Sequence, residues 1–331
     1  MDYSVFRAKN FQLQQGPALD LELAYKTQGS LNTTKDNVIL VLTSYAAQHD
    51  EAEQLVGPSD ILDLTSYYIV FIDMLCNGLS SSPSNTPAPY DGPRFPAVTI
   101  NDNVRCQHDL LQHLGISRLQ LVMGYSMGGL QAYEWASYYP DAVAAVLPIC
   151  GAARVAPHNF LFLDGAKAGL CADQTYAGGD YDAPPTAGLC AFSRVYAGWM
   201  FSQTFFRDRL YQAMGMNSIE DVVGMAQGYF MRRDANDLLG MLWTWQHADI
   251  SHNERYNDDF ESALNAISAR VIIMPCDTDL YFTVADSKSE LLHLKYAELR
   301  PIASHLGHVA GSGGVPAGKL AIDKAIMELL G

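Results

Sequence analysis

The sequence has few charged residues, and basic residues are especially scarce. Only 17% of the 331 residues are charged, and 36 acidic side chains outnumber 21 basic ones to give a formal net charge of -15. Because nucleic acids and anionic membrane surfaces are bound by clustered Lys and Arg, this balance argues against both as partners. Hydrophobic residues make up 49% of the chain, which indicates a globular protein with a substantial core.

The sequence also lacks long hydrophobic runs and cysteines spaced as in metal sites or redox motifs. No apolar run approaches the ~18 residues that a membrane-spanning helix needs, and residues 1–7 show no basic segment leading into an apolar one. We therefore expect a cytoplasmic protein. The six cysteines include no C-x-x-C pair and no metal-ligand spacing. The sequence thus predicts neither a metal site nor a cofactor, and reduced thiols are the simpler expectation even for Cys171 and Cys190, which bracket a Gly/Pro-rich stretch.

What the sequence does contain, over its first 150 residues, is an alternation of β-rich apolar runs with helical patterns. Thr99-x-x-Asp102 resembles a capping box and predicts a helix that runs to Leu114. Strands alternating with helices imply a parallel, doubly wound sheet of the α/β class. The predicted strands cover residues 37–43, 67–73, 119–123 and 143–149.

This alternation stops after Gly151 and returns only near the C-terminus. Residues 152–267 show helical patterns, Gly/Pro loops and many aromatics, whereas strands are predicted again at 271–274 and 298–302. We interpret residues 1–151 and 268–331 as one α/β core and residues 152–267 as an inserted helical cap. Such a cap would cover the carboxyl ends of the strands, where open α/β sheets bind ligands.

The most informative motif is Gly124-x-Ser126-x-Gly128, which directly follows the apolar run Leu-Val-Met and precedes a helical stretch. A strand, a sharp turn and a helix in this order are typical of a nucleophile elbow. The turn presents the serine hydroxyl at the helix N-terminus, where backbone N–H groups favour a developing negative charge. Ser126 is therefore predicted to be the nucleophile of an acyl-transfer reaction.

A serine nucleophile of this kind needs a histidine base and a carboxylate that orients it, in the chain order Ser, acid, His. Asp277 and Asp279 follow the late strand at 271–274, and either could be the acid. Beyond the last strand the candidates for the base are His305 and His308. The spacing alone leaves both choices open.

The tetrahedral intermediate of acyl transfer also needs two donors directed at its oxyanion. The residue after the nucleophile, Met127, is expected to supply one backbone N–H. The loop after the early strand, residues 43–46, is expected to supply the other through the backbone of Tyr45.

Several segments together resemble the homoserine O-acetyltransferase-like branch of the α/β-hydrolase superfamily. They are residues 23–32, Asn-Gly-Leu-Ser-Ser-Ser-Pro-Ser at 77–84, residues 95–102, Gly-Tyr-Ser-Met-Gly-Gly at 124–129 and Asp-Thr-Asp-Leu-Tyr at 277–281. The resemblance implies the α/β-hydrolase fold, with Asp279 as the acid and His308 as the base. It also implies a homodimer formed through cap helices.

One position departs from the acetyltransferase pattern. Those enzymes place an Asp after the catalytic histidine, which helps to hold the amino group of homoserine, whereas here Val309 follows His308. An apolar side chain cannot neutralise an ammonium. The segment at 77–87 and Ala-Pro-His-Asn at 156–159 resemble a sub-branch of short-chain acetate esterases. We therefore predict a hydrolase of small carboxylic, chiefly acetate, esters, with an O-acetyltransferase acting from acetyl-CoA on homoserine or another alcohol as the alternative.

Overall fold

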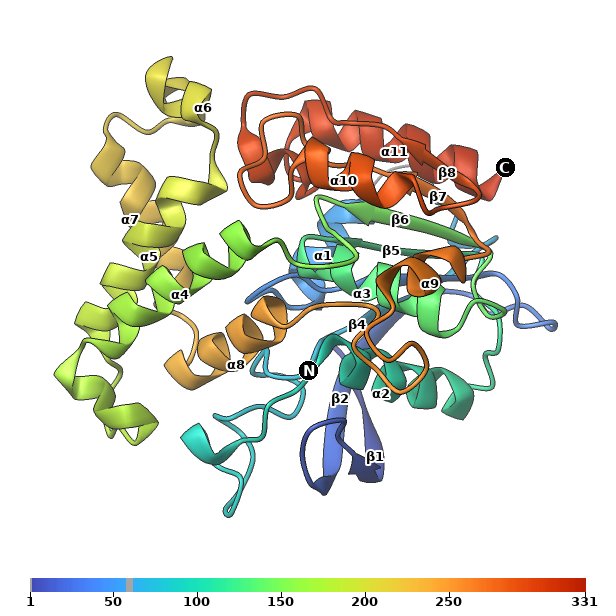
Figure 1. The fold of residues 1–331 in the computed structure, drawn as a ribbon, viewed down its shortest axis with the longest axis horizontal. Helices are drawn as coiled ribbons and strands as arrows, with labels where there is room; N and C mark the ends of the chain where they lie inside the picture. The colour runs from blue at the N-terminus through green and yellow to red at the C-terminus, as the bar shows by residue number, and fades with distance from the viewer. Residues whose placement is uncertain (1, 58–61) are drawn as a thin grey trace.

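The computed structural model describes residues 2–57 and 62–331, and it is built around one sheet (Figure 1). Its eight strands lie in the order β1-β2-β4-β3-β5-β6-β7-β8. β1 and β2 pair antiparallel, β2 also pairs antiparallel with β4, and all other neighbours are parallel. The strands are β1 (Ser4–Gln12), β2 (Ala18–Gly29), β3 (Val38–Leu42), β4 (Tyr68–Ile72), β5 (Leu121–Tyr125), β6 (Ala145–Ile149), β7 (Arg270–Ile273) and β8 (Ala297–Leu299).

Helices cover both faces of this sheet because its central strands are apolar on both sides. In β3, Ile39 and Val41 pack in one core with residues of α1 and α11, whereas Leu40 and Leu42 pack in another core with α2 and α3. The doubly wound, mostly parallel arrangement expected from the sequence is therefore confirmed. The covering helices are α1 (His49–Val56), α2 (Ile100–His113), α3 (Met127–Tyr138) and α11 (Pro316–Leu330).

The long segment between β6 and β7 is helical and gathers mostly at one side of the sheet, on the left in Figure 1. Aromatic side chains from this segment pack around Tyr45, which lies just beyond β3. The helices are α4 (Pro157–Cys171), α5 (Thr186–Met200), α6 (Gln203–Arg207), α7 (Ile219–Phe230), α8 (Ala235–Gln246) and α9 (Phe260–Asn265). The remaining α-helix follows β7 and is α10 (Val284–Leu291). There are also short 3₁₀ helices: η1 (Gly92–Arg94), η2 (Gln174–Gly179), η3 (Leu210–Met214) and η4 (Gly307–Gly311).

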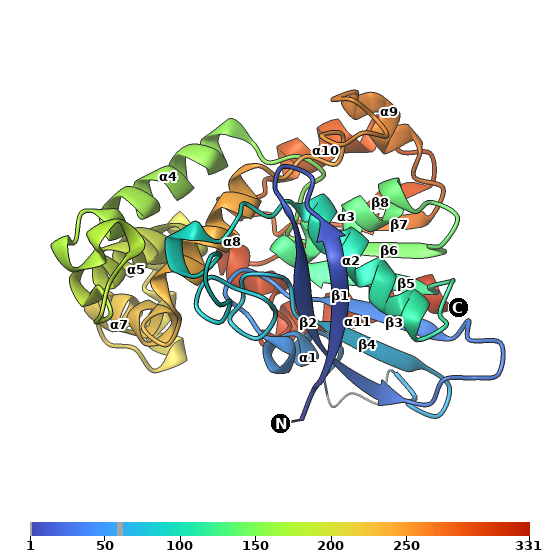
Figure 2. The same cartoon turned by 90° about the horizontal axis from the view of Figure 1, so that it is seen from below.

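Local signals in the sequence account for some element boundaries and not for others. The predicted capping box forms at the start of α2, where Thr99 Oγ1 accepts from the Asp102 N–H at 3.0 Å and Asp102 Oδ2 accepts from the Thr99 N–H at 3.0 Å. α1 and α10 were not predicted, because each has only eight residues. β1 was not predicted either. It lies at the sheet edge, exposes most of its side chains and forms a long ribbon with β2, seen from another side in Figure 2.

The parallel strands bring their carboxyl ends to one edge of the sheet. Four residues follow the ends of these strands: Tyr45 follows β3, Ser126 follows β5, Cys150 follows β6 and Asp279 follows β7. Residues that are far apart in the sequence are thus placed together there. All six cysteines are free thiols. Within residues 2–57 and 62–331, no helix has both the length and the apolar character needed to cross a membrane.

Candidate active site

The turn that carries Ser126 is tight enough to require glycine on both sides. β5 ends at Tyr125, α3 begins at Met127, and Ser126 between them has φ 58° and ψ -120°. A Cβ on Gly124 would lie 2.4 Å from the carbonyl carbon of Gly128, and a Cβ on Gly128 would lie 2.4 Å from the carbonyl oxygen of Leu42. A strained serine held between a strand and a helix in this way is the geometry of a nucleophile elbow.

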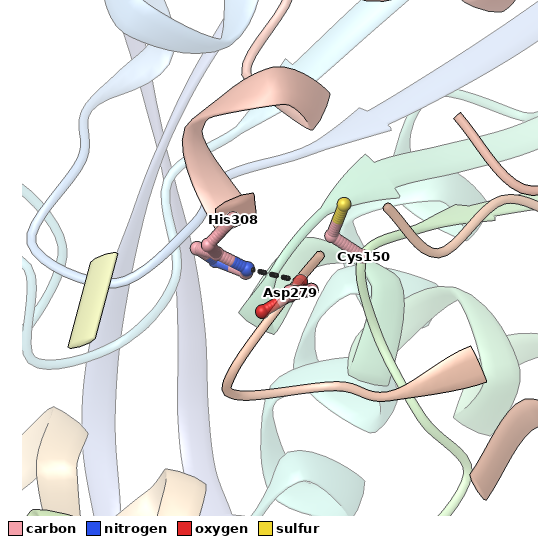
Figure 3. Close-up of side chains that lie close together, drawn as sticks. All are labelled: Cys150, Asp279 and His308. Carbon is pink, nitrogen blue, oxygen red and sulfur yellow. Dashed lines mark hydrogen bonds and ion pairs between the residues drawn. The ribbon is translucent and has the colours of Figure 1, made fainter. Parts of the chain in front are cut away.

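A hydrogen-bonded chain leads from Ser126 through a histidine to a carboxylate. His308 Nε2 lies 2.9 Å from Ser126 Oγ, and His308 Nδ1 lies 2.7 Å from Asp279 Oδ2. Figure 3 shows the imidazole facing the carboxylate. All three residues are buried, with 2%, 3% and 6% exposure for Ser126, His308 and Asp279. The spacing allows the imidazole to take the serine proton while the carboxylate holds the other ring nitrogen.

Backbone groups hold the Asp279 carboxylate in place. Its Oδ1 accepts hydrogen bonds from the N–H groups of Tyr281 at 2.8 Å and Phe282 at 3.3 Å. One oxygen is therefore satisfied by the following turn, and the other is directed at His308. Because both oxygens of this buried carboxyl group are hydrogen-bonded, its position next to the imidazole is fixed.

The other two candidates from the sequence lie elsewhere. Asp277 is exposed, and its Oδ1 accepts from the Ser304 N–H at 3.0 Å. His305 is exposed as well, and its carbonyl oxygen accepts from the Ser202 hydroxyl. The structure thus brings Asp279 and His308 to Ser126, whereas Asp277 and His305 stabilise loops around the site.

The two expected oxyanion donors belong to the start of α3 and to the loop after β3. Met127 is buried at the first position of α3, where a helix supplies no acceptor for the backbone N–H. Tyr45 follows β3, and within residues 2–57 and 62–331 its backbone N–H donates no hydrogen bond. Its phenol donates to the Leu238 carbonyl in α8 at 2.9 Å. Burial raises the pKa of the Tyr45 phenol well above its usual range, so this donor stays protonated.

A cavity of about 280 Å³ adjoins Ser126 and His308. Its wall is mostly apolar and aromatic, with a polar part formed by Glu51, Gln54 and Ser312. Val309 lies in the wall directly after the base. Residues of α5 and α7 supply much of the remaining surface: Tyr196, Met200, Met225, Ala226, Tyr229 and Phe230.

One group of buried side chains has the composition of a metal site. The ligand atoms of Cys150, Asp279 and His308 all lie within 4.8 Å of one another (Figure 3). Asp279 and His308 already hydrogen-bond each other. Burial raises the pKa of the Cys150 thiol well above its usual range, and a protonated thiol is a poor ligand. The cluster therefore fits a triad packed against a structural cysteine.

Two charged residues beside the site, Glu51 and Arg233, were not predicted from the sequence. Glu51 lies in the cavity wall, and its Oε2 accepts from Arg233 Nη2 at 2.9 Å. Glu51 belongs to the short helix α1, which was not predicted from the sequence. Arg233 lies in the loop between α7 and α8. Nothing in the sequence pairs two residues separated by 182 positions.

Comparisons with known proteins agree with this fold. The family model for the alpha/beta hydrolase fold matches residues 37–282. The chain therefore belongs to the α/β-hydrolase family. An ethyl acetate hydrolase of Pseudomonas veronii is 38% identical over 93% of this chain and 89% of its own length. A homoserine O-acetyltransferase of Trichormus variabilis is 32% identical over 91% of this chain and 87% of its own length.

Among solved structures, the acetyl esterase MekB superposes with a TM-score of 0.95. It is 36% identical, and the match covers 99% of this chain and 96% of MekB. The predicted membership of the branch that contains both esterases and acetyltransferases is confirmed. Within it, these two esterases are more similar to the chain than the acetyltransferase is.

Proposed function

We propose that the protein is a serine hydrolase that cleaves small carboxylic esters, chiefly acetates, through an acyl-enzyme. The observation that carries this proposal is the chain of hydrogen bonds from Ser126 Oγ to His308 Nε2 and from His308 Nδ1 to Asp279. The similarity of the chain to an ethyl acetate hydrolase and to an acetyl esterase supports acetate as the acyl group.

In the first half-reaction, Ser126 Oγ attacks the ester carbonyl and His308 Nε2 takes the hydroxyl proton. The N–H groups of Tyr45 and Met127 bind the oxyanion of the tetrahedral intermediate. The imidazolium then gives its proton to the departing alcohol, which leaves acetylated Ser126. Asp279 orients the ring and stabilises its positive charge throughout.

In the second half-reaction, His308 takes a proton from the attacking water, and acetate leaves as Ser126 recovers its proton. Water is preferred here to an amino alcohol because the cavity wall next to the base is Val309, an apolar side chain. Among the described residues of that wall the one carboxylate is Glu51, and it is already paired with Arg233. A homoserine ammonium would thus lack an unpaired anionic partner in the described wall.

The cap, the assembly and the location belong to the same proposal. Residues 152–267 would form the cap over a core of residues 1–151 and 268–331. The protein would act as a cytoplasmic homodimer formed through cap helices, on a small-molecule ester and without a metal or cofactor.

The test is a direct competition between the two acyl acceptors. With 4-nitrophenyl acetate or ethyl acetate, the enzyme should release acetate, and added homoserine should divert little of the acetyl group. Phenylmethylsulfonyl fluoride should label Ser126, and Ser126→Ala should remove both labelling and turnover, with a loss on the order of 10⁶ in kcat. Faster acetylation of homoserine from acetyl-CoA than hydrolysis of either ester would favour the transferase. Retained turnover in Ser126→Ala would overturn the mechanism.

A further inference from the structure

The turn that carries the proposed oxyanion donor Tyr45 is conformationally strained. The Ala47 N–H donates to the Ser44 carbonyl at 3.2 Å and closes a β-turn with Tyr45 and Ala46 at its centre. Ala46 has φ 58°, a value that favours glycine at this turn position. An alanine stays in this conformation only when its surroundings hold it there. The direction of the Tyr45 N–H therefore depends on what holds the turn.

Arg233 contacts this turn from the loop between α7 and α8. Its Nε donates to the Ala46 carbonyl at 2.7 Å, and its Nη2 donates to Glu51 Oε2 at 2.9 Å. The same carboxylate oxygen accepts from the Gln48 N–H at 2.8 Å, at the start of α1. The Arg233 side chain is only 15% exposed. One guanidinium thus bridges the carbonyl of the strained residue Ala46 and helix α1, which follows the turn.

Two further hydrogen bonds hold the same turn. The Tyr45 hydroxyl donates to the Leu238 carbonyl in α8 at 2.9 Å, and Asn77 Nδ2 donates to the Ala47 carbonyl at 3.1 Å. Arg233 and Leu238 are both in the helical segment, only five positions apart in the sequence. Residues 233–238 therefore hold the turn at two points, the Tyr45 hydroxyl and the Ala46 carbonyl.

We propose that Arg233 is a positioning residue for the oxyanion hole: it holds the Ala46 carbonyl so that the Tyr45 N–H stays directed at the oxyanion. This inference rests on the proposed function. Arginine suits the role because its planar guanidinium presents donors in fixed directions, here to a carbonyl and a carboxylate at once. A lysine ammonium could keep the ion pair with Glu51 without reproducing that fork.

The test compares Arg233→Met with Arg232→Met. Arg232 is the preceding residue and is exposed, and it lies over the Tyr229 ring at 5.8 Å, as Arg233 does at 5.3 Å, so it is a matched control. For each variant, kcat and KM are measured with 4-nitrophenyl acetate, together with the inhibition constant of a trifluoromethyl ketone, whose adduct with the serine carries an oxyanion. Folding is checked by circular dichroism and thermal melting.

We expect Arg233→Met to lower kcat by about 10- to 100-fold, since a small misplacement of a catalytic group can cost about 10²-fold. The inhibition constant of the ketone should rise by a similar factor, while KM stays within about twofold. Arg233→Lys should fall between the wild type and Arg233→Met. If Arg233→Met does not fold, the same measurements on Arg233→Lys test whether Arg233 positions the oxyanion hole.

The proposal is overturned if kcat and the ketone inhibition constant match those of Arg232→Met, or if KM alone changes. It is also overturned if kcat falls while ketone binding is unchanged, because the oxyanion would then not be involved. Failure of the proposed function would look different. The wild type would then form no ketone adduct, and Ser126→Ala would keep its turnover.

Discussion

His49 Nδ1 lies 2.7 Å from Asp73 Oδ2, the same distance that separates His308 Nδ1 from Asp279 Oδ2. All four residues are buried. Within residues 2–57 and 62–331 the protein thus contains two buried histidine–aspartate pairs with the geometry of an acid that orients a base. The distance between imidazole and carboxylate alone does not tell which pair acts on a substrate.

The other ring nitrogen distinguishes the two pairs. His308 Nε2 faces the Ser126 hydroxyl at 2.9 Å, whereas His49 Nε2 faces a second carboxylate, Asp2, at 3.6 Å. The hydrogen bond that His49 donates to Asp73 raises the pKa of His49 above its usual value, with smaller contributions from Asp2. A histidine between two carboxylates favours the charged form, which cannot accept a proton. His49 therefore fits a structural role.

The first prediction separates the two aspartates that the sequence left open. Asp279→Asn should preserve the fold and lower kcat by about 10⁴-fold, because an amide supports the wrong tautomer of His308. Asp277→Asn should have a far smaller effect, since an amide oxygen can still accept from the Ser304 N–H. Steady-state kinetics on both variants, with circular dichroism as the check on folding, would decide the matter. The reverse ranking would contradict the assignment of Asp279.

The second prediction concerns the elbow. Gly128→Ala would place a Cβ 2.4 Å from the Leu42 carbonyl oxygen, so the helix must shift away from β3. We expect a loss of stability of about 1–3 kcal/mol and a kcat reduced by about 10²-fold or more, because Ser126 moves with the helix.

Gly165→Ala is the control for that experiment. Gly165 lies in α4, is exposed, and a Cβ there would meet no atom within 4 Å. This change should stabilise the protein by about 0.5–1 kcal/mol, as expected for Ala in place of Gly in a helix. Equal effects of the two substitutions on thermal melting and kcat would show that the elbow is not sterically constrained.

The third prediction uses a buried carboxyl of α3 that does not contact the substrate cavity. Burial raises the pKa of Glu134 from 4.5 to about 8, although the hydrogen bond from Asn101 Nδ2 at 2.7 Å opposes the shift. The folded protein therefore binds a proton that the unfolded chain releases near pH 4.5. This contribution to stability is fully present below that pH and is lost as the pH rises through about 8.

Glu134→Gln should remove that pH dependence. Between about pH 6 and about pH 9 the wild type should lose on the order of 1–3 kcal/mol more stability than the variant. Thermal or urea unfolding at a series of pH values measures the difference. Glu254→Gln, at an exposed carboxylate, is the control and should follow the wild type. Parallel curves for the wild type and Glu134→Gln would mean that Glu134 is ionised in the folded protein.

Local patterns in the sequence determined the elements of the core. The continuous apolar runs could be stable only as strands covered on both faces, and Gly124-x-Ser126-x-Gly128 between a strand and a helix defined the elbow, because both signals act over a few adjacent residues. The chain order of serine, acid and base restricted the other site residues to two aspartates and two histidines. Choosing Asp279 and His308 among them needed the family resemblance, since the spacing is equally good for either member of each pair.

Only the tertiary structure decided which distant side chains meet. The contact of Arg233 with Ala46 joins residues 187 positions apart, and the contact of His308 with Ser126 joins residues 182 positions apart. No local signal encodes such a contact, because it depends on how the strands are ordered in the sheet and on where the segment between β6 and β7 packs. The same holds for His49 and Asp73. Their pairing arises because β3 and β4 are neighbours, and it follows from the strand order and not from any motif.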